Sequence, residues 1–196
     1  SPFSHSALDI KTLAMAAHLQ GLYSSNLDVT GLSQKYGAVN SHVRIAPSPD
    51  LLHATRIGAG ETDTLIGCDL VVAAGNEAIA TLEPGRSRAT VCADVVPTSD
   101  FARNPDWALD GAALTQRLTG LLGDRVRLID GLRLSRALLG DPIASNMMML
   151  GAAWQSGQVP LPRAAIERAI ELNGVAVRMN QEAFTWGRRF VVDPAA

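Results

Sequence analysis

The sequence predicts an α/β fold: a Rossmann-like, mostly parallel sheet flanked by helices, with a C-terminal helical cap. Two observations predict it. Over the first 140 residues, short apolar runs typical of strands alternate with amphipathic stretches typical of helices. After residue 140, three helical stretches follow one another. We therefore expect an α/β domain at 1–140 and a helical extension at 141–196 that packs on the same domain.

The first elements are a helix and short strands. Residues 7–19 space their apolar side chains as a helix does, and Ser6 can cap it. Residues 42–46 alternate polar and apolar side chains, as a half-buried strand does, and 26–29 form a short strand candidate before them. Residues 69–74 are apolar after the aspartate, which predicts a central parallel strand covered on both faces.

The following elements continue the alternation and then give way to helices. The predicted elements are a helix at 77–82, a strand at 89–93, a helix at 112–122, a strand at 126–130, and helices at 132–139, 143–155, 163–172 and 175–189. Met147, Met148 and Met149 are consecutive, and neighbours on a helix point about 100° apart. We therefore expect the methionine side chains to be buried on several sides of this helix, and self-association of the chain is one way to bury them.

Composition excludes several classes of function. The chain has 196 residues and a net charge of −2, and without a basic run we expect no nucleic-acid partner. No stretch reaches the roughly 18 apolar residues of a membrane span, and the first residues do not resemble a secretory signal. Cys68 and Cys92 lie in apolar, strand-like contexts, which favours buried thiols over a disulfide or metal pair. We expect a cytoplasmic protein without a membrane partner.

The residues 30–45 form the candidate recognition loop. Two glycines punctuate a polar run that contains Gln34, Lys35, Ser41 and Arg44. Lysine is rare, since only two occur against fifteen arginines. Lysine and arginine side chains can hold phosphate or carboxylate, so the run is typical of a ligand-facing loop. The alternatives are a solvated connection and, for Arg44, an arginine at a strand edge that faces solvent.

Further candidates follow from the rule that open α/β sheets bind ligands at the carboxyl ends of their strands. That rule selects Asn76 and Asn104, although Asn76 can instead cap the helix that follows it. The sequence contains no G-x-G-x-x-G turn, Walker A loop or G-x-S-x-G elbow. Its spacing also supports no nucleophile–base pair and no metal site. We therefore predict no catalytic residue and no metal ligand in this chain.

An ordered set of motifs resembles a known family. The set is Met15-Ala-Ala-His-Leu, the run 30–45, Gly67-Cys-Asp-Leu-Val-Val-Ala-Ala, the turn around Asn104-Pro-Asp-Trp107, and Asn173-Gly-Val-Ala-Val with Trp186-Gly-Arg188. Together they resemble the gamma domain of 2-oxoacid:ferredoxin oxidoreductases, and most closely that of the long-chain indolepyruvate type. The resemblance covers nearly the whole chain.

The resemblance implies an architectural part inside a larger enzyme. That enzyme oxidatively decarboxylates an arylpyruvate such as indolepyruvate, uses CoA as cosubstrate and passes electrons to ferredoxin. Thiamine diphosphate, Mg and iron–sulfur clusters then belong to partner domains or subunits. Two cysteines cannot supply the four thiolates that a cluster normally needs.

The sequence departs from the family at its start. The family's gamma domain opens with a strand and a glycine-rich turn, whereas this chain begins Ser-Pro-Phe-Ser-His-Ser. Either this start has been lost or replaced, or the chain has no phosphate-cradling turn, and the second alternative weakens the case for nucleotide or CoA binding at the N-terminus of the first helix. We expect a non-catalytic gamma-type domain that lines a site with Gln34, Lys35, Ser41, Arg44, Asn76 and Asn104. The alternative is a free-standing nucleotide- or CoA-binding module.

Overall fold

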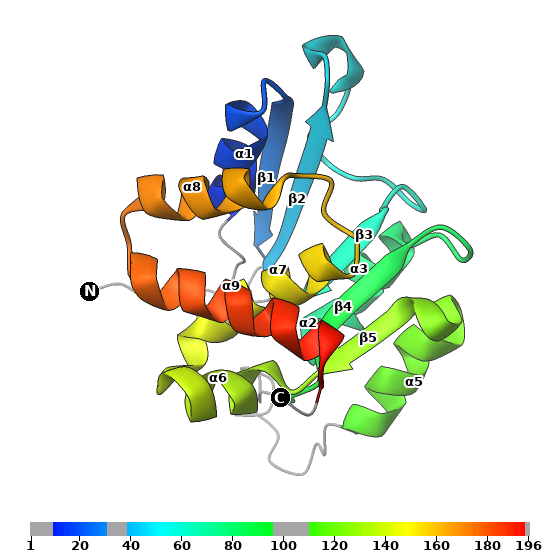
Figure 1. The fold of residues 1–196 in the computed structure, drawn as a ribbon. Helices are drawn as coiled ribbons and strands as arrows, with labels where there is room; N and C mark the ends of the chain where they lie inside the picture. Colours follow the sequence, from blue (N-terminus) through cyan, green and yellow to red (C-terminus); the bar gives the residue numbers. More distant parts are fainter. Residues whose placement is uncertain (1–9, 31–38, 96–109, 195–196) are drawn as a thin grey trace.

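The computed structural model describes residues 10–30, 39–95 and 110–194 (Figure 1). The strands are β1 (Tyr23–Thr30), β2 (Val39–Ala46), β3 (Thr64–Gly67), β4 (Arg88–Cys92) and β5 (Val126–Ile129). The α-helices are α1 (Ile10–Leu19), α2 (Leu70–Ala73), α3 (Asn76–Thr81), α5 (Gly111–Leu122), α6 (Gly131–Leu139), α7 (Ser145–Gln155), α8 (Arg163–Asn173) and α9 (Val177–Val192). Short 3₁₀ turns are η1 (Pro49–Leu51), η2 (Gly123–Arg125) and η3 (Pro142–Ala144).

A parallel sheet of three strands, in the order β3-β4-β5, lies at the centre of the fold. Helices cover both of its faces, as parallel sheets require. Because successive strand residues point to opposite faces, β4 serves two cores. Ala89 and Val91 pack with α2 and α5, and Cys92 packs with Met149 and Ala152 of α7. The predicted fold class is confirmed.

Strands β1 and β2 form a separate antiparallel hairpin. It pairs without interruption from Tyr23↔Ala46 to Thr30↔Val39, so it includes both short strands predicted from sequence and extends them. Helix α1 lies along the hairpin, and Ile45 points into the core that α1 shares with α8. In Figure 1 the hairpin extends away from the parallel sheet.

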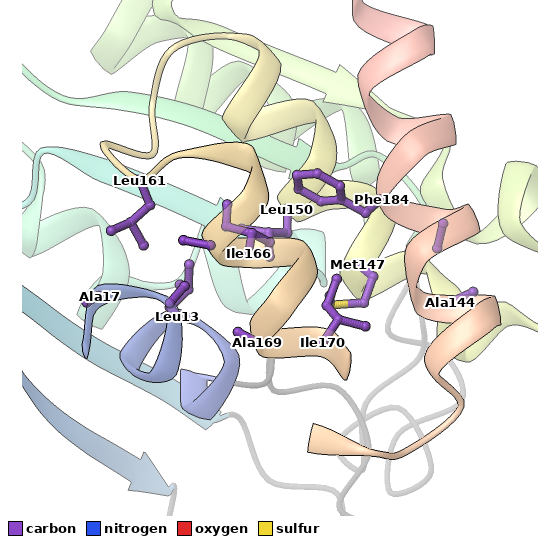
Figure 2. Close-up of a cluster of buried hydrophobic side chains, with 13 residues drawn as sticks. Leu13, Ala17, Ala144, Met147, Leu150, Leu161, Ile166, Ala169, Ile170 and Phe184 are labelled. Atoms are coloured by element: carbon purple, nitrogen blue, oxygen red, sulfur yellow. The ribbon is translucent and has the colours of Figure 1, made fainter. Parts of the chain in front are cut away.

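The C-terminal helices build the largest core around α7. Figure 2 shows Leu13 of α1, Leu150 of α7, Ile166 of α8 and Phe184 of α9 gathered in one cluster. The three consecutive methionines of α7 are all buried, with Met147 in this cluster and Met149 against the sheet. The expectation of burial on several sides is confirmed. Other helices and the parallel sheet of the same chain supply this burial.

The prediction of a strand at 69–74 was wrong. The strand β3 comes earlier, at Thr64–Gly67, and the apolar run forms the helix α2. Asp69 explains the difference, because its carboxylate accepts hydrogen bonds from the backbone N–H groups of Val71 and Val72. Such a cap begins a helix and is incompatible with continuing a strand. Asp69 therefore follows a strand instead of starting one.

The apolar residues 190–192 belong to the helix α9. Cys68 and Cys92 are not joined in a disulfide. Among the described residues, no helix combines the length and apolarity needed to cross a bilayer. The division of the chain at residue 140 stays a prediction.

Candidate functional site

One face of β2 carries the polar residues of the candidate site. Asn40, His42 and Arg44 occupy alternate positions, so they share a face, and Ser41 points to the other. The shared face lies against the segment 56–61 and the first turn of α3. His42 and Arg44 are hydrogen-bonded to the segment 56–61, and Asn40 is hydrogen-bonded to α3.

Arg44 forms an internal ion pair. Its Nη2 donates to Oε2 of Glu61 and to the backbone carbonyl of Arg56, 3.1 Å away. The backbone N–H of Gly58 donates to the same Glu61 oxygen at 2.9 Å. This N–H and the Arg44 guanidinium hold the pKa of the Glu61 carboxyl below its usual range. Since its charge is already balanced, Arg44 is poorly placed to hold an added anion.

His42 is fixed as an acceptor in the same network. Its Nδ1 accepts a hydrogen bond from the backbone N–H of Ile57 at 2.9 Å. Partial burial lowers the pKa of His42, and the positive charges of Arg56 and Arg44 lower it further. The histidine is therefore held neutral and joins β2 to the segment 56–61.

The end of the hairpin that carries Thr30 and Val39 is tied by two further hydrogen bonds. Nδ2 of Asn40 donates to Oε2 of Glu77 in α3, at 3.1 Å. Oγ of Ser41 donates to Oδ1 of Asp28, its cross-strand neighbour, at 2.6 Å. Because Ser41 and Arg44 lie on opposite faces of β2, the structure does not bring these two predicted site residues together.

Asn76 has a different role from the cap considered above. Gly75 occupies the cap position of α3, and Asn76 is the first helical residue. Its side-chain oxygen accepts a hydrogen bond from Nη2 of Arg117 in α5, and Nη1 of Arg117 donates to the carbonyl of Ala74 at 2.9 Å. Asn76 thus helps to join α3 to α5. Gln34, Lys35 and Asn104 lie outside the described residues.

Sequence reasoning missed the partners that fix this hairpin. Glu61, Asn40 and His42 were not selected, although the alternation of Asn40, His42 and Arg44 marks one polar strand face. Glu61 gave no local signal, because it lies 17 positions from Arg44 in the sequence.

The described residues contain no group of three or more histidine, cysteine or acidic side chains that could hold a metal ion. The Cys92 thiol donates to Asp94 Oδ2 at 3.2 Å, and burial raises its pKa, so a reactive thiolate is disfavoured. Asp94 also accepts from the backbone N–H of Leu132 at 2.9 Å, which fixes the start of α6.

Comparison with family models matches residues 10–190 to the family described as pyruvate ferredoxin/flavodoxin oxidoreductase. The chain belongs to this family. The match runs from α1 to α9, so it includes the hairpin, the parallel sheet and the C-terminal helices. No curated protein sequence matches the chain.

Two solved structures of the same fold are similar to this member of the family. One is the gamma subunit of a keto/oxoacid ferredoxin oxidoreductase from Geobacter sulfurreducens, with a TM-score of 0.61 at 14% identity over 94% of this chain and 89% of that one. The other is the PORC subunit of a pyruvate oxidoreductase from Thermotoga maritima, with a TM-score of 0.60 at 17% identity over 91% and 85%. At these identities the likeness supports the fold.

Proposed function

We propose that the chain is a gamma-type subunit or domain of a thiamine-diphosphate-dependent 2-oxoacid ferredoxin oxidoreductase of the indolepyruvate type. Its part is structural and site-lining, and the chemistry belongs to partner subunits. The observation that supports this most is the family match over residues 10–190 in a chain whose described residues show positioning contacts. Ferredoxin then receives electrons through the partners, and we expect the assembly to lie in the cytoplasm.

The hairpin network suggests how the chain would line a site. The backbone pairing of β1 with β2 continues to Thr30↔Val39, the two residues on either side of the segment 31–38. Asn40 joins this end of the hairpin to α3. The ends of that segment are therefore fixed relative to the body of the fold. Under the proposal, Gln34 and Lys35 meet the partner's substrate or CoA, together with Asn104. Ser41, Arg44 and Asn76 hold the surrounding backbone in place.

The cofactors fit partner chains better than this one. Iron–sulfur clusters are held by cysteine thiolates, usually four, and this chain has two cysteines. One of them, Cys92, is buried and its pKa is raised. We therefore assign thiamine diphosphate, Mg and the clusters to the partner subunits, with CoA as the cosubstrate of the assembly.

Isolation of the native assembly tests the proposal. The chain, carrying an affinity tag, is purified from its source under anaerobic conditions, and the associated proteins are identified by mass spectrometry. We expect partners that contain thiamine diphosphate and iron in stoichiometric amounts. Recovery of the tagged chain without a thiamine-dependent partner would contradict the proposal.

A free-standing nucleotide- or CoA-binding module is the alternative. This alternative depends on Lys35 and Arg44 as anion-binding side chains, and the pairing of Arg44 with Glu61 weakens its support. Calorimetric titration of the chain with CoA and adenine nucleotides distinguishes the two functions. Tight binding by the chain without partners would favour the module.

A further inference from the structure

A polar hollow of about 650 Å³ opens at the amino-terminal edge of the parallel sheet. It is lined by the first residues of β4 and β5, by η2 and by the connection between α7 and α8: Arg88, Asp124, Arg125, Val126, Arg127, Leu128, Ser156 and Gln158. This edge is opposite to the carboxyl ends of the strands, where α/β sheets usually bind their ligands. None of the residues that line the hollow takes part in the hydrogen bonds of the candidate site.

The hollow exists because α7 covers only part of one sheet face. Arg127 is the register partner of Thr90, and Arg88 lies two positions before Thr90, so all three point to the face that α7 covers. Further along, Cys92 and Ile129 on that face pack against Met149 and Ala152 of α7. Helix α7 ends at Gln155, which leaves the arginines at the strand starts exposed.

The connection after α7 is held firmly beside the hollow. Oγ1 of Thr64 donates to the backbone carbonyl of Gln158 at 2.8 Å, and Oγ1 of Thr90 donates to its side-chain oxygen at 3.0 Å. These two hydrogen bonds use the oxygen atoms of Gln158, so its side-chain NH₂ group remains a donor within the described part of the chain. The Ser156 hydroxyl is buried in the wall and has no hydrogen-bond partner in the described part of the chain.

The charge of the hollow is unbalanced within the described residues. Six arginines form ion pairs, Arg117 bonds to Asn76 and Ala74, and two more lie over aromatic rings. Five described arginines have no such partner: Arg56, Arg88, Arg125, Arg127 and Arg136. Three of these five line the hollow, where Asp124 is the one carboxylate. Guanidinium groups and the Gln158 amide thus line one space, and such donors suit an acceptor with several negative oxygens.

We propose that the hollow receives an acidic segment of a partner subunit, with carboxylates set against Arg88, Arg125 and Arg127. This inference rests on the proposed function, because it assumes that the chain assembles with other subunits. A polypeptide fits the hollow better than a small molecule, because small-molecule pockets are mostly apolar and only Val126 and Leu128 are apolar here. Arginine is enriched at protein interfaces, where complementary charge sets orientation and partner choice.

Charge reversal in the complete assembly tests the inference. The affinity of the chain for its purified partner subunits is measured by biolayer interferometry at low and high salt. We expect the double variant R88E/R127E to bind at least about 30-fold more weakly at low salt, as loss of desolvated charge pairs does. We also expect salt to weaken wild-type binding more than binding of the variant.

The matched control is R136E/R178E, which changes the net charge equally at two exposed arginines outside the hollow. It should bind within about twofold of wild type, and both variants should keep the wild-type melting temperature. Equal binding by R88E/R127E and wild type would overturn the inference and leave the proposed function intact. A wild-type chain that binds no partner would contradict both.

Crosslinking identifies the occupant. A photoreactive benzoylphenylalanine replaces Asp124, an exposed residue that lines the hollow, in the assembled complex, and the captured peptide is sequenced. We expect a partner peptide with at least two acidic residues. Capture of a second copy of this chain, or of no peptide, would overturn the inference.

Discussion

The contacts of His42 and Arg44 show how single side chains join distant segments of this fold. Each belongs to β2, and each bonds to the segment 56–61 through a backbone group or a carboxylate. The hairpin is therefore attached to the rest of the chain through polar contacts, in addition to the apolar contacts that α1 supplies on its other face.

His42 gives this attachment a pH dependence. The pKa of His42 is below 6.5 in the folded chain, so between that lowered value and 6.5 the folded state binds fewer protons than the unfolded state. The stability contributed by neutral His42 is therefore present above pH 6.5 and is lost as the pH falls through this window.

We expect His42→Asn, which keeps an acceptor near the Ile57 N–H, to reduce the loss of stability on acidification. Urea unfolding at a series of pH values measures it. His53→Asn, at an exposed histidine, is the matched control for removing one histidine. If His42→Asn and wild type lose the same stability between neutral and acid pH, the assigned role of His42 is wrong.

Lys35 belongs to the segment that we propose meets the partner. We expect Lys35→Ala to lower the activity of the assembled enzyme about tenfold or more, as loss of a positioning charge does, with little change in melting temperature. Turnover of the complex and thermal unfolding of the chain are measured side by side. Equal losses of turnover and of melting temperature would show that Lys35 stabilises the fold instead of positioning a ligand.

At the scale of elements, Asp69 decides that the run after it is a helix. Asp69→Ala removes the acceptor for two N–H groups and should cost about 1 kcal/mol of unfolding free energy. Asp69→Asn keeps an acceptor and should stay within about 0.5 kcal/mol of wild type at pH 7, because asparagine caps helices equally well. Urea unfolding of the two variants at pH 7 measures both effects.

A comparison of wild type with Asp69→Asn at several pH values also distinguishes the capping role of Asp69 from the effect of its charge. Burial raises the pKa of Asp69 above 3.8, so the folded state binds more protons than the unfolded state between 3.8 and the raised value. Wild type should lose stability relative to Asp69→Asn as the pH rises through that window. The opposite trend would mean that the capped carboxylate is stabilising in its ionised form.

Helices α7 and α9 approach each other through two glycines. A Cβ at Gly187 would lie 1.9 Å from the carbonyl oxygen of Met148, and one at Gly151 would lie 2.1 Å from that of Phe184. We expect Gly187→Ala to destabilise the chain by about 3 kcal/mol, because two backbones would have to separate. Denaturant unfolding measures this change.

Gly120→Ala in α5 is the matched control, since nothing lies within 4 Å of its Cβ position. It should stabilise the chain by about 0.5–1 kcal/mol, the usual gain from glycine to alanine inside a helix. A wild-type stability for Gly187→Ala would show that α7 and α9 pack less closely than described.

Local patterns predicted most of these elements, and the strand predicted wrongly at 69–74 reflects a local helix cap by Asp69. The strands β4 and β5 and the helices after residue 110 follow their hydrophobic periods closely. The run at 69–74 resembles a strand because it is apolar after Asp69, but Asp69 caps a helix there. Predicting a strand from apolarity alone fails where a short buried helix has the same composition.

At the scale of the whole molecule, the sequence predicted the class of fold but not how the site residues pair. Arg44 was selected as a charge for a ligand, and its partner Glu61 became evident only when the hairpin and the segment 56–61 were seen together. Arg88, Arg125 and Arg127 were likewise unremarkable along the chain. They gather because parallel strands start at the same edge of the sheet.

We propose that this chain completes a 2-oxoacid ferredoxin oxidoreductase whose chemistry is located in its partners. The direct measurement is the rate of CoA-dependent ferredoxin reduction with indolepyruvate, by the partner subunits alone and after the chain is added back. We expect little activity without the chain and full activity at one equivalent. Equal rates with and without the chain, or turnover by the chain without its partners, would contradict the account.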